Sequence, residues 1–360
     1  MPTSPVPRSW PPEAASPAGA ARLLPILWGL LWAGCVDQPV CLLPPGGTTP
    51  ARLLSELGVY VGTAGVLQPA PGFIRYDVAV PLYSDEAAKH RLLRLPPGER
   101  LRAAADRWEV PPGTLLVKTF MYPLDARAPE RGEQRVETRF LSFGQAAVTA
   151  ATYLWNADQT DAVCSGGNQD VPTRFVDEDG AARSDHFHVP GVSQCSSCHN
   201  DRALGLRTRQ LDIAGTYADG TTRQIEHLIN LGALDAPPPV RGALPEPQGT
   251  APLGERARAY LDANCAHCHY EDGDAKGTGL FFGLEHTTAA ELPVCRRAAA
   301  VDGHDRVIVP GRPEESVLLL RMRSPDPFVR MPRGPTHIPD RAGLAVLSAW
   351  IAAMAPGGCP

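Results

Sequence analysis

Two short cysteine motifs carry the clearest chemical signal in this sequence. Residues 195–199 read C-S-S-C-H, and residues 265–269 read C-A-H-C-H. In such a pentapeptide, two cysteines three positions apart can form thioethers to the vinyl groups of a haem, and the adjacent histidine can ligate the iron. Chance placement of 9 Cys and 10 His in 360 residues gives roughly 0.006 such motifs, so two are not accidental. The sequence therefore predicts two c-type haems per chain, held by Cys195, Cys198, His199, Cys265, Cys268 and His269.

Two other readings of the C-x-x-C pairs fit the spacing less well. Zinc ribbons place their paired knuckles about 15–20 residues apart, whereas Cys198 and Cys265 are several times further apart and both pairs are followed by histidine. A thioredoxin-like pair begins a helix, but the pattern of residues 254–269 indicates a helix that already runs before Cys265. We therefore favour haem attachment over zinc binding or thiol exchange.

Met331 is the expected sixth ligand of the second haem. The stretch from His269 to Met331 is long enough to cross the edge of a porphyrin, and an amphipathic segment follows that could pin it. A soft, neutral thioether favours ferrous iron and raises the reduction potential. Met322 is the rival, but it ends an apolar helical run and is expected in the core.

The sixth ligand of the first haem is less well defined, because the sequence has no methionine between Met121 and Met322. His227 is the leading candidate among the metal ligands, and His186 and His188 are alternatives, as is an iron with an open position. His267 lies inside its own motif and is expected at the surface.

The first 35 residues have the pattern of an export leader. Arg8 and Arg22 precede the apolar run 23–31, which is too short to span a bilayer, and small residues then precede Cys35. We expect export to the periplasm or the cell surface, with Cys35 as a candidate lipid attachment site and possible membrane anchor. The net charge is -5 and no basic block occurs, which argues against nucleic-acid binding.

The expected fold class is multidomain α and β: an antiparallel β sandwich followed by a mostly α-helical haem region. Residues 73–80 and 135–140 alternate with a period of two, and proline-glycine turns separate such runs. Beyond residue 190 the alternation with a period of two gives way to apolar residues at helical spacing. Thr221 and Gln224 suggest a capping box, and residues 344–354 form an amphipathic helix.

Four further cysteines outside the leader are even in number, which in an oxidising compartment indicates disulfides. They are Cys41, Cys164, Cys295 and Cys359. Cys295 with Cys359 is the favoured pair, because both belong to the last part of the chain, although sequence alone cannot fix the connectivity.

The second half resembles a small class-I-type cytochrome c domain. The resemblance covers residues 253–355 and rests on the motif with Tyr260 and Asn264, the run around Pro310, the Met331–Pro332 pair and the last helix with Trp350. From Leu54 onward the chain also resembles a family of secreted bacterial proteins with a β-rich front half and haem-c motifs behind. The expected divisions are a leader at 1–35, a linker at 36–58, the β sandwich at 59–190, the first haem segment at 191–245 and a cytochrome c-like domain at 246–360.

Together these features predict an exported dihaem protein that transfers electrons to or from a redox partner protein. The alternative is a peroxidase-like haem oxidoreductase, in which the first iron is open and Asp185, His186 or His188 serves as acid or base.

Overall fold

The computed structural model describes most of the chain after residue 39. The described residues are 40–44, 46–62, 67–104, 107–191, 194, 203–215, 217, 219–239, 242–288, 291–334, 336–357 and 359. Asp37–Pro360 form one compact unit. The first haem motif and the predicted leader lie outside the described residues.

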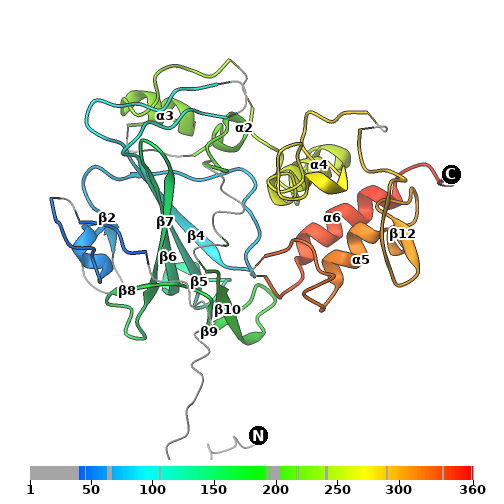
Figure 1. Ribbon diagram of the computed structural model, residues 1–360, viewed down its shortest axis with the longest axis horizontal. Helices are drawn as coiled ribbons and strands as arrows, with labels where there is room; N and C mark the ends of the chain where they lie inside the picture. The colour runs from blue at the N-terminus through cyan, green and yellow to red at the C-terminus, as the bar shows by residue number, and fades with distance from the viewer. Residues whose placement is uncertain are drawn as a thin grey trace, which may run out of the picture. The chain divides into compact units, whose positions relative to one another are not determined.

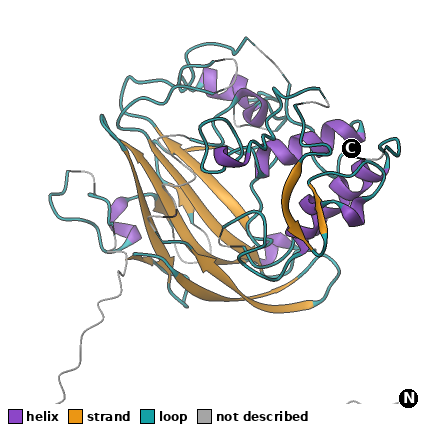
Figure 2. Ribbon diagram, turned by 45° about the vertical axis from the view of Figure 1, so that its right-hand side comes forward, coloured by secondary structure: helices purple, strands orange, loops and turns teal. Residues whose placement is uncertain are grey.

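The sheet with the most strands in the described part of this unit is antiparallel and six-stranded, and its strands follow one another in chain order (Figure 1). The strands are β3 (Ile74–Arg75), β4 (Ala88–Arg94), β5 (Leu115–Pro123), β6 (Glu133–Phe143), β7 (Val148–Trp155) and β8 (Ala162–Ser165). Two smaller hairpins accompany it, β1 (Tyr60–Val61) with β2 (Gln68–Pro69) and β9 (Gln169–Val176) with β10 (Ala182–Val189). Figure 2 shows the strands as a curved layer with helices beside it.

The sheet buries apolar side chains on both faces, because successive residues of a strand point to opposite sides. Leu92 and Leu93 of β4 are each 1% exposed and belong to different core clusters. The cluster of Leu92 is covered by the 3₁₀ helix η1 (Leu54–Leu57), and a disulfide from Cys41 to Cys164 ties this segment to β8.

The opposite face is covered by two short helices, α2 (Thr208–Leu211) and α3 (Gln224–Asn230). Leu211, Ile225 and Leu228 are buried there against Leu93. The capping box predicted at Thr221 is not formed, since α3 begins at Gln224 and the Thr221 hydroxyl donates to Asp219 Oδ1 at 2.8 Å.

The C-terminal part packs three helices and one hairpin around a separate apolar core. Its helices are α4 (Leu253–Asn264), α5 (Val317–Arg323) and α6 (Arg341–Ala352), with the 3₁₀ turns η3 (Lys276–Thr278) and η4 (Pro313–Glu315). Strands β11 (Arg297–Val301) and β12 (His304–Arg306) form the hairpin. The predicted last helix is confirmed, and the Asp340 carboxylate caps it by accepting from Gly343 N.

Helices α4 and α6 approach closely at Gly343. A methyl group at this position would lie 2.2 Å from the Tyr260 ring, so only glycine admits the contact. The Tyr260 hydroxyl then reaches Asp340 Oδ2 at 2.9 Å. The disulfide between Cys295 and Cys359 fastens the end of the chain, as the sequence predicted.

The predicted fold class is wrong. The structure has 27% strand against 19% helix, with only five α-helices among the described residues, so no mostly α-helical cytochrome c-like region follows the β part. The helical patterns at 254–269 and 344–354 do not continue through the whole second half. Between them the chain forms turns, the β11–β12 hairpin and the short helix α5, and before them α2 and α3 cover the sheet.

Candidate haem attachment site

The second cysteine motif lies directly after α4, where the backbone continues to turn. Cys265 N donates to Leu261 O at 2.9 Å, and His269 N donates to Cys265 O at 3.0 Å. Cys268 N donates to Cys265 O at 3.2 Å. These bonds bring the two thiols and the imidazole of His269 onto consecutive turns of chain, which is the arrangement that attachment through two thioethers requires.

His269 has its imidazole fixed by a backbone carbonyl. Its Nδ1 lies 3.0 Å from Leu280 O, and the edge of Phe282 meets the ring at a centroid distance of 5.1 Å. A ring that donates through Nδ1 keeps the lone pair of Nε2 for a metal, as histidine ligands commonly do. Burial lowers the pKa of His269, so the neutral imidazole that a metal needs is favoured.

Both cysteines of this motif are half-buried, and Cys265 forms no disulfide. Burial raises the pKa of Cys265 to about 12, which disfavours the thiolate. Thiol exchange and zinc ligation both use the thiolate. The environment of Cys265 is therefore a poor one for either of the two competing chemistries.

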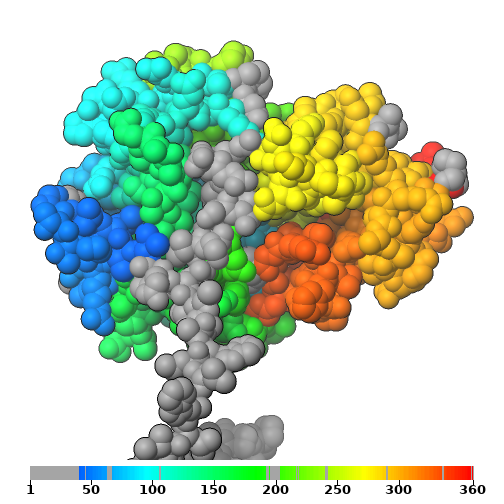
Figure 3. All heavy atoms as spheres, in the orientation of Figure 1, coloured from blue at the N-terminus to red at the C-terminus, as the bar shows by residue number. Residues whose placement is uncertain are grey.

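A cleft of about 300 Å³ opens beside the motif, lined by residues of two distant parts of the chain. Ala266 and His267 of the motif share it with Leu204, which follows the first motif closely in sequence. The two parts are tied by an ion pair in which Arg207 Nη1 lies 2.9 Å from Asp262 Oδ2, and Asp262 is almost fully buried. The segment around residues 255–285 is yellow in Figure 3 and lies at the surface of the face in view.

The structure places Met331 in the loop between α5 and α6. It is half-buried, and its backbone N–H donates to Arg321 O at 3.2 Å. Met322 is 5% exposed within the C-terminal core, as expected for a structural methionine. The positions of Cys195, Cys198 and His199 lie outside the described residues.

His227 lies on α3, in the layer that covers the sheet. Its Nδ1 is 3.0 Å from Asp219 Oδ2, and its ring stacks on Tyr217 at 4.6 Å. Burial alone would raise the pKa of the neighbouring Asp219. Hydrogen bonds from Thr221, His227 and Asn230 instead hold this pKa well below its usual range. With Nδ1 held by Asp219, Nε2 is the ring nitrogen through which His227 could bind a metal.

In a second cluster, His337 lies beside Asp185 and His186. The sequence pointed to Asp185 and His186 only as an acid or base at the first haem and, for His186, as a candidate iron ligand. His337 and its buried partner Asp85 gave no local signal, since they come from loops far apart in the chain and meet only in the folded protein.

No protein-family model, no curated protein and no solved structure matches this chain. Among the described helices, none combines the length and the apolar character needed to cross a bilayer.

Proposed function

We propose that this chain binds haem covalently at both C-x-x-C-H motifs and transfers electrons. The observation that carries the proposal is the geometry of His269, whose Nδ1 contacts the Leu280 carbonyl and whose Nε2 is left for an axial metal bond. Haem, once bound, supplies one-electron oxidation and reduction at its iron.

The use of cysteines in the chain supports this assignment. Cys41 pairs with Cys164 and Cys295 pairs with Cys359, whereas Cys265 forms no disulfide. In a chain that forms disulfides elsewhere, two half-buried thiols at thioether spacing are suited to capture vinyl groups. Cys195, Cys198 and His199 carry the same motif, so we extend the proposal to a second haem.

The protein residues around each iron would set its potential. Met331 is our candidate sixth ligand for the haem at His269, because a thioether stabilises ferrous iron. His227 is our candidate for the haem at His199.

The cleft beside the second motif is the expected region of approach for a redox partner. It is lined by Ala266 and His267 of the motif and by Leu204.

The full assignment includes export and a redox partner outside the cytoplasm. Cys35 would carry lipid and attach the chain to a membrane. Replacing Cys35 with Ala should release the protein from the membrane fraction, and a wild type that is already soluble would contradict lipidation.

Covalent haem can be counted by intact mass and by haem staining after denaturation. Wild type should gain the mass of two haems, and Cys265→Ala/Cys268→Ala should gain only one. The matched variant Cys195→Ala/Cys198→Ala should also gain one. A wild type without bound haem would overturn the proposal, and a wild type with a single haem would overturn the assignment at one motif.

Met331 can be tested by its effect on one potential. Met331→Ala should lose the weak near-infrared sulfur-to-iron band of the oxidised protein and lower one of two reduction potentials. Met322→Leu, which keeps the volume of the core side chain, should change neither. Persistence of the band in Met331→Ala would exclude this ligand.

A further inference from the structure

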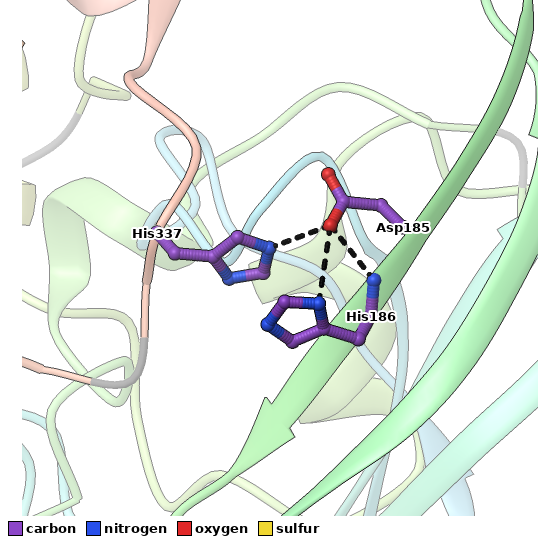
Figure 4. Close-up of side chains that lie close together, drawn as sticks. All are labelled: Asp185, His186 and His337. Carbon is purple, nitrogen blue, oxygen red and sulfur yellow. Dashed lines mark hydrogen bonds and ion pairs between the residues drawn. The ribbon is translucent and has the colours of Figure 1, made fainter. Parts of the chain in front are cut away.

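Outside the cysteine motifs, one group of side chains has the donor atoms of a metal site. Asp185 and His186 are consecutive residues of β10, and His337 lies in the loop between α5 and α6 (Figure 4). One ligand atom from each residue lies within 4.8 Å of the others. We propose that these three residues bind one divalent first-row transition-metal ion, a role independent of haem.

The backbone around His337 is held in place by a buried carboxylate. Asp85 is 1% exposed, and its oxygens accept from His337 N at 3.0 Å and from Ile338 N at 2.9 Å. The loop is thereby fixed against the turn that precedes β4. This fixed backbone positions the imidazole of His337 in the absence of any ligand, so little ordering is left for the binding step.

The imidazole of His337 lies between two carboxylates. Its Nδ1 is 2.9 Å from Asp85 Oδ2, and its Nε2 is 2.9 Å from Asp185 Oδ1. Of these two contacts, only the one from Nε2 to Asp185 has hydrogen-bond geometry. Nδ1 is a buried ring nitrogen without a hydrogen-bond partner among the described residues, so the side chain offers a donor atom that the fold itself does not use.

A metal ion bound by the imidazole of His337 could also be ligated by Asp185, whose Oδ1 lies 2.9 Å from Nε2. Asp85 would hold the backbone of the loop through the N–H groups of His337 and Ile338. Asp85 thus serves as a positioning residue, and Asp185 and His337 as ligands.

His186 completes a set of two imidazoles and one carboxylate. Its ring is parallel to that of His337 within 2°, with centroids 4.1 Å apart, and its Nδ1 lies 3.4 Å from Asp185 Oδ1. The side chain of His186 is 48% exposed, so its ring can tilt to turn a nitrogen toward the ion.

The donor set defines the class of metal. Imidazole suits zinc, copper, iron and nickel, and two histidines with one carboxylate leave positions open for water or a substrate. Calcium and magnesium prefer all-oxygen sites. Zinc is the suitable probe because it has no redox chemistry of its own to disturb the haems.

A second group of possible metal ligands provides a control for the zinc experiment. Glu271, Glu285 and His286 also bring ligand atoms within 4.8 Å of one another, but both carboxylates are exposed. We therefore place the tighter site at Asp185, His186 and His337, and His286→Ala is the matched control variant.

Zinc binding to the full haem-loaded chain, stripped with a chelator, can be followed by calorimetry and by elemental analysis after dialysis. Wild type should hold one Zn²⁺ per chain. Loss of a residue that only contacts a metal ligand typically weakens metal binding about 10–100-fold. Loss of a ligand itself should cost no less, so His186→Ala, Asp185→Asn and His337→Ala should each weaken zinc binding at least tenfold. His286→Ala should bind as wild type does.

Three results would overturn the site: no stoichiometric zinc in wild type, undiminished binding in His186→Ala, or loss of binding in His286→Ala. His186→Ala is decisive even where His337→Ala fails to fold, because the His186 side chain is half exposed and carries no part of the core.

Discussion

Buried ionisable groups are charged and paired in the sheet, whereas at the second cysteine motif their neutral forms are favoured. In the sheet, buried charges are paired: Glu137 is fully buried, and its two oxygens accept from Arg139 at 2.8 and 2.7 Å. At the motif, burial disfavours the ionised forms of both Cys265 and His269. A buried charge needs its partner to be stable, whereas a neutral imidazole keeps the lone pair that a metal bond needs. The contrast separates groups that stabilise the fold from the histidine at which we propose haem binding.

The strongest test of this contrast is to break the buried pair. Replacing Arg139 with Met keeps the bulk but leaves Glu137 as an unpaired buried charge, which costs about 3–5 kcal/mol. Chemical denaturation should show this loss in the free energy of unfolding. Arg297→Met removes the exposed partner of Asp305 and should leave stability unchanged. Equal losses of stability in Arg139→Met and Arg297→Met would contradict the view that the buried pair stabilises the fold more than the exposed one.

The next largest effect should come from the C-terminal disulfide. Replacing Cys295 and Cys359 with Ala opens a loop with a sequence separation of 64 and should lower stability by about 2–4 kcal/mol. Both residues lie outside the haem motifs, so the covalent haem content should stay at the wild-type value. Loss of haem in this variant would show that the disulfide also shapes the attachment site.

The contact between α4 and α6 should be sensitive to a single methyl group. Gly343→Ala drives its new methyl into the Tyr260 ring and should cost about 1–3 kcal/mol, as overpacking does. At Gly254 a methyl would meet its nearest atom only at 3.5 Å, so Gly254→Ala should be neutral or slightly stabilising. Thermal unfolding of the two variants makes the comparison, and a stable Gly343→Ala would mean that the helices can move apart.

The smallest effect concerns a partly exposed pair in the sheet. Burial alone would raise the pKa of Glu133, but the hydrogen bond and charge of His90 and the charge of Arg135 lower it. A carboxyl group whose pKa is lowered in the folded state stabilises the fold at pH values above the usual glutamate range. This contribution to the free energy of unfolding is lost as pH falls through the folded-state pKa. Glu133→Gln should therefore cost under about 1 kcal/mol near neutral pH and nothing in acid. A difference that does not shrink in acid would rule out this charge effect.

Local patterns in the sequence predicted local structure well. The alternating run at 135–140 lies within β6, whereas the run at 73–80 forms a strand only at Ile74–Arg75. The helical pattern at 344–354 lies mostly within α6. The favoured pair Cys295 and Cys359 is also present. The fold class failed, because the same helical periodicity describes a short helix that covers a sheet and one that belongs to a bundle. That choice depends on tertiary packing.

The candidate site shows the same limit. The C-x-x-C-H motif was visible because its residues are neighbours in the chain. The Leu280 carbonyl that orients His269 was not, since it is a backbone atom supplied by a later loop. Asp85, Asp185 and His337 meet only through the fold, and no spacing in the sequence links them.

The order of the cysteines along the chain bears on how the protein matures. Cys41 and Cys164 both precede the first motif, and Cys295 and Cys359 both follow the second. A chain that emerges N-terminus first can close its first disulfide before any cysteine of the two motifs appears. It then offers both C-x-x-C pairs before the last two cysteines arrive. Neither disulfide loop encloses a motif, so disulfide formation and the haem attachment that we propose would use separate stretches of chain.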